Sequence, residues 1–77
     1  MDGSLKMIGT VIRVFLDKGY GFIRGSDGLS RFLHASDLQE GEDWDLIKLD
    51  THIEFDSAES KSGKGNGLKA INVRLLN

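Results

Sequence analysis

The stretch Lys18-Gly19-Tyr20-Gly21-Phe22-Ile23-Arg24 decides the fold of this 77-residue chain. In an extended strand, side chains alternate between the two faces. One face then carries Lys18, Tyr20, Phe22 and Arg24, so that two rings lie between two cations. The opposite face carries Gly19, Gly21 and Ile23, and the glycines predict close backbone packing behind the rings or a strongly bent strand.

Rings and cations on one strand are suited to an unpaired nucleic-acid strand. Bases stack on aromatic rings, and phosphates pair with Lys and Arg. The alternative is a half-buried strand whose rings enter the core. The heptad alone leaves both interpretations open.

Four further segments have the composition and alternation of β-strands. We expect Phe32 and His34 on one face of the third strand and Leu33 on the other. The inward residues of the later strands are expected to be Ile53 and Phe55, then Ile71, Val73 and Leu75. The predicted strands, in chain order, span 6–16, 20–24, 31–35, 51–56 and 68–76.

The connections between these strands contain the residues that turns require. Tight turns are expected at 17–19 and 25–28, and a flexible loop at 57–67. Residues 36–38 are expected to form one helical turn with Ser36 as its N-cap. The acidic segment 39–50 is the least readable and has room for one short helical turn. Five short strands joined by Gly-rich turns predict an all-β barrel or sandwich.

Length and composition place the chain among small globular domains. Residues 1–5 are expected to form a loose leader and residues 6–77 a single domain. The sequence has no cysteine, which excludes disulfides and thiolate metal sites. It has neither a signal-peptide pattern nor a long apolar run, so the expected location is cytoplasmic.

The formal net charge of −2 conceals a strong asymmetry along the chain. Residues 1–36 carry five cations and three anions, residues 37–59 carry nine acids and one lysine, and residues 60–77 carry four cations and no acid. Binding of a polyanion by bulk charge usually requires a basic domain. Any attraction for nucleic acid must therefore come from a local basic patch.

Residues 7–36 resemble the cold-shock domain family. The segment MIGTVIRVFLDKGYGFI is similar to the family's first strand and first nucleic-acid motif, and RFLHAS is similar to its second motif. Weaker similarity in DTHIEFDSAE and GLKAINVRLL extends the match to about residue 76. The resemblance implies a five-stranded antiparallel barrel of the oligonucleotide/oligosaccharide-binding (OB) type. It favours the stacking interpretation of the rings over the core one.

The resemblance implies that five positions bind single-stranded RNA or DNA, and all five are intact. They are Lys18, Tyr20, Phe22, Phe32 and His34. Arg24 belongs to the same face, and Lys64 in the loop before the last strand is a candidate phosphate contact or a solvated residue.

Other positions depart from the family pattern. Arg13 stands where an exposed tryptophan is usual, Val14 and Ala35 stand where phenylalanines are usual, and Ile12 replaces a lysine. Arg13 compensates in part, because a guanidinium stacks on bases and pairs with phosphate. Trp44 is either a substitute ring or an anchor for the acidic loop.

Arg31 also departs from the family pattern, because it stands where the family has an apolar inward residue. The physical interpretation that the sequence offers is a side chain snorkelling from an edge strand.

Neither catalysis nor a cofactor is indicated. His34 and His52 lie on separate strands without a ligand set at metal spacing, and GYGFIRG lacks the spacing of a dinucleotide fingerprint.

The competing hypothesis is a protein-interaction module that keeps the barrel and docks a basic partner on the acidic stretch 37–59. The binding hypothesis implies RNA chaperoning or regulation of transcription or translation.

Overall fold

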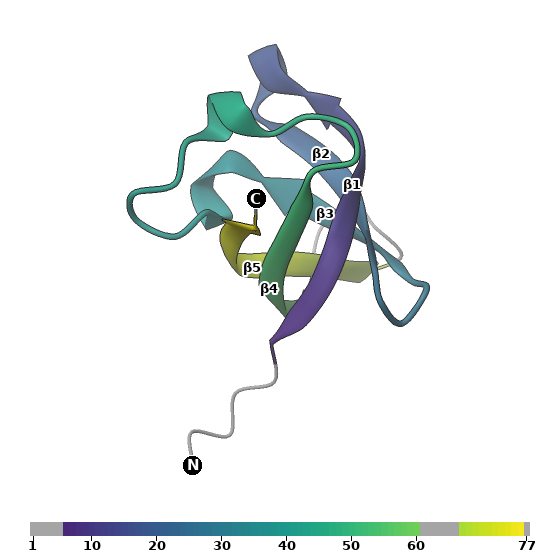
Figure 1. The fold of residues 1–77 in the computed structure, drawn as a ribbon. Helices are drawn as coiled ribbons and strands as arrows, with labels where there is room; N and C mark the ends of the chain where they lie inside the picture. The colour runs from purple at the N-terminus through teal and green to yellow at the C-terminus, as the bar shows by residue number, and fades with distance from the viewer. Residues whose placement is uncertain (1–5, 61–66, 77) are drawn as a thin grey trace.

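The computed structural model describes residues 6–60 and 67–76. This part of the chain contains five strands and three short 3-10 turns, and Figure 1 shows how the strands are arranged. The expected leader 1–5 and Lys64 lie outside the described residues. The elements are β1 (Met7–Phe15), η1 (Leu16–Lys18), β2 (Tyr20–Gly25), β3 (Ser30–His34), η2 (Ala35–Asp37), η3 (Trp44–Leu46), β4 (His52–Glu59) and β5 (Leu68–Leu76).

The strands close into a barrel in the order β1-β2-β3-β5-β4. Four pairings are antiparallel, and β3 pairs with β5 in parallel through Phe32 and Lys69. The predicted all-β fold with a five-stranded OB-type barrel is confirmed, with one parallel junction where the barrel closes. Because the barrel is closed, β2 and β3 pair with each other and each also has a second neighbouring strand.

The barrel encloses a small apolar core. Ile23 and Leu33 are fully buried, as the alternation along β2 and β3 predicts, and so are Ile53 and Phe55 of β4. The predicted inward faces of these three strands are confirmed. The buried cluster consists of Val11, Ile23, Leu33, Ile47, Ile53, Phe55, Ala70 and Val73.

The inward face of β5 differs from the prediction. Val73 is buried and Leu75 packs against the core, but Ala70 is buried in place of Ile71, which is only half-buried. The reason is an irregularity: Asn72 has a φ of 51°, and the register with β4 shifts between Glu54 and Asp56. Asn tolerates this left-handed conformation better than most residues, so it resets the alternation at that point.

The turn after β3 forms as expected but has a different cap. The 3-10 turn is Ala35–Asp37, and its N-cap is His34, not Ser36. The Ser36 backbone N–H donates to His34 Nδ1 at 3.0 Å. Residues 57–59 of the expected loop 57–67 belong to β4, which continues to Glu59, and residues 61–66 lie outside the described residues.

Arg31 is a buried charge and not a snorkelling side chain. Its exposed fraction is 3%, and β3 has neighbours on both sides in the closed barrel. Two of its nitrogens donate to the two carboxylate oxygens of Asp27, at 2.9 and 2.7 Å, and Nε donates to Ser57 Oγ at 2.8 Å. The guanidinium carbon also lies 5.5 Å from the ring centroid of Phe55. A buried charge requires this degree of pairing.

The Asp27–Arg31 pair changes the ionisation of both groups. The hydrogen bonds from Arg31 hold the pKa of the Asp27 carboxyl well below its usual range, and the Leu29 backbone N–H adds to the effect. The hydrogen bond with the Asp27 carboxylate raises the pKa of Arg31. The pair therefore remains ionised at neutral pH and ties the β2–β3 turn to the barrel.

Candidate nucleic-acid interface

Four rings lie together on the outer face of β2 and β3. The strands align so that Tyr20 pairs with His34 and Phe22 with Phe32. The ring centroids of Phe22 and Phe32 are 5.8 Å apart, those of Tyr20 and Phe32 are 5.7 Å apart, and those of Phe32 and His34 are 6.2 Å apart. His34 is exposed and the other three are half-buried. We call these four residues the ring face.

Gly21 lies between Tyr20 and Phe22 on β2, at a position where a side chain would not fit. A Cβ at Gly21 would overlap the carbonyl oxygen of Arg13 and approach the Cα of Val14 to 3.1 Å. The backbones of β1 and β2 are therefore in close contact behind Tyr20 and Phe22, as predicted. Gly19 has a different role, because its φ of 77° ends η1 in the left-handed region.

A fifth ring, Phe15, joins the ring face and was missed in the sequence. Its centroid lies 5.1 Å from that of Tyr20, and the Arg13 guanidinium carbon lies 5.8 Å from the Phe15 ring centroid. Strict alternation from the buried Val11 would place Arg13 and Phe15 inside the barrel. A register shift in β1 between Val11 and Arg13 reverses the faces. No local residue marks this bulge, so the sequence pattern gave no signal for it.

Three predicted cations lie on β1, η1 and β2, the elements that carry or adjoin the rings. Arg13 and Arg24 are exposed on β1 and β2. Lys18 is exposed too, but it lies in η1, so the prediction that it continues the β2 face was wrong. The chain turns at Gly19 before the strand begins, and extended alternation does not apply to Lys18. None of the three forms an ion pair with a described residue, so all are available to phosphates.

Trp44 anchors the acidic loop. Its indole N–H donates to the Leu16 carbonyl at 3.1 Å, and the side chain packs against the core cluster. It begins η3, the short helical turn for which the acidic segment had room. These contacts favour the anchoring alternative, and a base contact by its remaining exposed surface stays a prediction.

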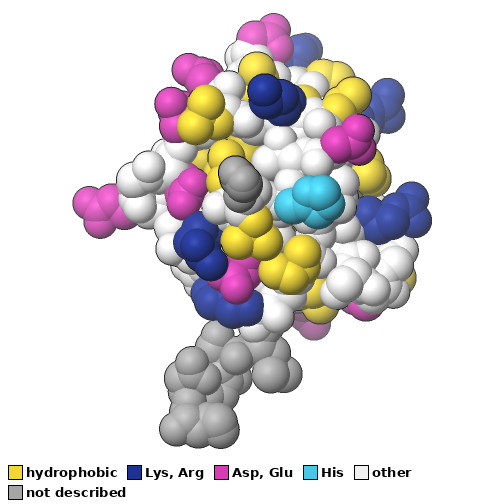
Figure 2. Space-filling model, in the orientation of Figure 1, with side chains coloured by type: hydrophobic (Ala, Val, Ile, Leu, Met, Phe, Trp, Pro, Cys, Tyr) yellow, Lys and Arg dark blue, Asp and Glu magenta, His cyan; other side chains and the backbone are white. Residues whose placement is uncertain are grey.

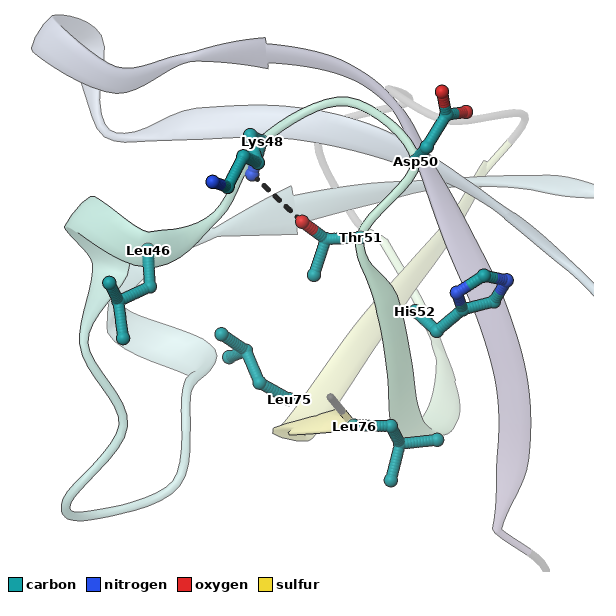
Figure 3. A pocket seen from close by; sticks show the side chains of 7 residues that line it. All are labelled: Leu46, Lys48, Asp50, Thr51, His52, Leu75 and Leu76. Carbon is teal, nitrogen blue, oxygen red and sulfur yellow. Dashed lines mark hydrogen bonds between the residues drawn. The ribbon is translucent and has the colours of Figure 1, made fainter.

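A hollow of about 460 Å³ lies away from the rings, between η3 and the end of β5. Figure 3 shows Leu46, Leu75 and Leu76 at one side of it, and the Lys48 backbone N–H donates to Thr51 Oγ1 at 3.1 Å. Side chains of both charge signs are scattered over this face, and hydrophobic ones gather near the end of β5 (Figure 2). His52 is the aromatic side chain that lines the hollow, and no described Phe, Tyr or Trp does.

A second hollow, of about 450 Å³, borders the ring face directly. Phe32 and His34 form one side, and Lys69 lies at the β3–β5 junction. Asp37 and Glu59 complete the rim. This hollow therefore places charged side chains next to two of the rings.

Across residues 6–60 and 67–76, no three His, Asp or Glu side chains are grouped so that they would hold a metal ion. Among the same residues, no helix has the length and apolar character needed to cross a membrane.

Comparison with known families assigns the chain. The sequence model described as the 'Cold-shock' DNA-binding domain matches residues 7–76, which include every described strand. Both motifs of the ring face lie inside the match. No curated protein matches the chain. Cold-shock domains are nucleic-acid-binding folds and not a family of enzymes. From the length of this match and the barrel that carries it, the chain belongs to the cold-shock DNA-binding domain family.

Proposed function

We propose that the chain binds single-stranded RNA or DNA by stacking unpaired bases on the ring face. The observation that carries the proposal is the cluster of rings on the outer face of β2 and β3, beside three cations with no ion pair among the described residues. Stacking on one ring is worth about 1–3 kcal/mol. Three stacked bases therefore supply about 3–9 kcal/mol, and a micromolar complex needs about 8 kcal/mol.

The mechanism requires no chemical energy. Stacked bases cannot pair with a complementary strand at the same time, so binding competes with duplex formation and traps melted RNA or DNA. This competition supports a role as an RNA chaperone or as a regulator of transcription or translation. Stacking alone does not select between ribose and deoxyribose, so RNA and DNA are both proposed ligands.

A nuclear magnetic resonance titration tests this proposal. Oligo-U or oligo-dT added at low salt should shift the signals of Tyr20, Phe22, Phe32 and His34 together. Binding should weaken with salt because phosphate contacts release counterions. The absence of submillimolar binding by either oligonucleotide would rule out the proposal.

A second candidate is the protein-interaction module, and one observation favours it. Leu46 and Leu49 of the acidic stretch are 58% and 60% exposed, and Leu46 lines the hollow of Figure 3. A basic segment with apolar side chains suits such a surface. The same titration separates the two candidates, since this one requires the ring face to remain unshifted by oligonucleotides.

A further inference from the structure

We infer that the hollow beside the ring face holds a guanine base of the bound strand; this inference rests on the proposed function. We call the hollow the β3–β5 pocket and define it by Phe32, His34, Asp37, Glu59 and Lys69. Its volume of about 450 Å³ lies within the range of about 300–1,000 Å³ that small-molecule sites occupy.

The fold brings the five residues together from three strands and one turn. Phe32 pairs with Lys69 across the parallel β3–β5 junction, so both side chains lie on the outer face there. Asp37 is held in η2, directly after β3, and Glu59 ends β4. A base that stacks on Phe32 therefore has an ammonium group beside it and carboxylates at the rim.

The His34 ring is fixed in one orientation and one tautomer. The Ser36 backbone N–H donates to Nδ1 at 3.0 Å, and Ser36 Oγ lies 2.8 Å from the same nitrogen. Because Nδ1 accepts a hydrogen bond, the hydrogen of the neutral ring is assigned to Nε2. His34 therefore offers the pocket the flat side of its imidazole and one N–H donor, at Nε2.

The polar groups at the rim match guanine better than the other bases. An ionised carboxylate only accepts hydrogen bonds, and it accepts two neighbouring donors at once. Guanine alone presents two neighbouring donors on its pairing edge, N1–H and the N2 amino group, with the acceptor O6 beside them. Uracil and thymine present one donor between two acceptors, and adenine and cytosine present an amino group next to an acceptor. Lys69 supplies the donor that O6 requires.

Within residues 6–60 and 67–76, the two carboxylates are also free of ion pairs. Asp37, Glu59 and Lys69 form no ion pair with one another or with other described residues. Acids at the edge of a surface that binds phosphates weaken binding to the backbone. Such acids are expected where a base donates hydrogen bonds to the protein. They accept from the correct base, and they repel the phosphates of a strand that binds in another register.

The first test compares strands that differ at one base. Fluorescence anisotropy should be measured with a U-rich hexamer and with versions carrying one G, A or C at each position in turn. One position should prefer G over U by about 5- to 150-fold, the discrimination that a bidentate pair provides. Inosine at that position lacks the amino group and should bind with intermediate affinity.

The second test uses isosteric variants and a matched acid elsewhere. Asp37→Asn and Glu59→Gln each remove one carboxylate, and at least one of them should reduce the G/U affinity ratio toward one. Lys69→Met should reduce it as well. Asp45→Asn removes an exposed acid of η3 outside the pocket and should leave the ratio unchanged. Because each ratio is measured within one protein, a loss of folded fraction cancels.

The outcomes separate this inference from the proposed function. If the U-rich strand binds but no position prefers G, the guanine pocket is wrong and the stacking proposal stands. A G preference that persists in both carboxylate variants, or that Asp45→Asn also abolishes, likewise overturns the pocket. If no strand binds, the proposed function itself fails.

Discussion

Truncation of Phe22 to alanine should weaken nucleic-acid binding more than it weakens the fold. The Phe22 ring lies in the middle of the ring face, 6.3 Å from the Tyr20 centroid at 90° and 5.8 Å from the Phe32 centroid. Loss of one stacked base costs about 1–3 kcal/mol, which raises the dissociation constant about 5- to 150-fold. Anisotropy with oligo-U at fixed salt measures this change.

The stability cost of the same substitution follows from burial. A fully buried Phe→Ala change costs about 3–5 kcal/mol, and Phe22 is only half-buried. The expected loss is about 2 kcal/mol, or about 8–16 °C in the melting temperature of a domain of this size. Part of this cost is the lost edge contact with the two neighbouring rings.

Phe55→Ala is the matched control. Phe55 is fully buried and lies under the Arg31 guanidinium, on the opposite side of the sheet from the ring face. This variant should lose about 3–5 kcal/mol of stability in urea unfolding, while its folded fraction binds oligo-U normally. If Phe22→Ala costs as much stability as Phe55→Ala and binds oligo-U with unchanged affinity, Phe22 is a core residue and the ring face is wrong.

Three further predictions concern the backbone, the buried ion pair and the charges. Gly21→Ala should destabilise the barrel strongly in urea unfolding, because its Cβ would overlap the Arg13 carbonyl oxygen. Gly41→Ala meets open space at a φ of 92° and should cost only about 1–2 kcal/mol of backbone strain. The lowered pKa of Asp27 stabilises the fold above its ordinary value near 4, and this contribution is lost as pH falls below that value. Asp27→Asn should therefore be less stable than the parent protein at pH 7 in chemical unfolding, with a difference that shrinks below about pH 4; a constant difference would contradict the role of the Arg31 pair. If four cations contact phosphates, the logarithm of the binding constant for oligo-U should fall with the logarithm of salt concentration with a slope of about −3, and a slope near zero would exclude phosphate contacts.

The sequence predicted the ring face well because β2 and β3 are regular. No register shift interrupts their pairing, so strict alternation correctly separated Tyr20 and Phe22 from Gly21 and Ile23. The same rule placed Leu33 on the face opposite Phe32 and His34, and the family resemblance indicated which face points outward. Local pattern is sufficient where both strands of a pair keep their register.

The rule failed where the register shifts. The bulge in β1 brings Phe15 onto the ring face, and the irregularity at Asn72 places Ala70 in the core in place of Ile71. In both cases the faces depend on how the strand pairs with its neighbour, β2 for β1 and β4 for β5, which alternation along one strand does not contain. The snorkelling interpretation of Arg31 was wrong for a related reason, since its burial depends on the closed barrel and on Ser57 of β4.

The arrangement of charges explains how an acidic chain can bind a polyanion. Three cations are neutralised by acids of the barrel: Lys6 by Asp56, Arg31 by Asp27 and Arg74 by Glu54. Lys48 lies beside the hollow that is away from the rings. The remaining described cations form no ion pair with described residues, and all of them lie on or next to the ring face; they are Arg13, Lys18, Arg24 and Lys69.

The net charge of −2 therefore does not describe the local surface that a nucleic acid would meet. Pairing removes three positive charges from other parts of the barrel, while Trp44 fastens the acidic loop to η1. At about 0.15 M salt, charges separated by more than about 8 Å are largely screened. Under those conditions the charges nearest the rings govern the encounter with phosphates: the cations that form no ion pair with a described residue attract them, and Asp37 and Glu59 at the edge of the ring face oppose them. At lower salt the acids oppose binding more strongly, so the slope of about −3 that four phosphate contacts predict should hold near 0.15 M salt and become shallower at lower salt.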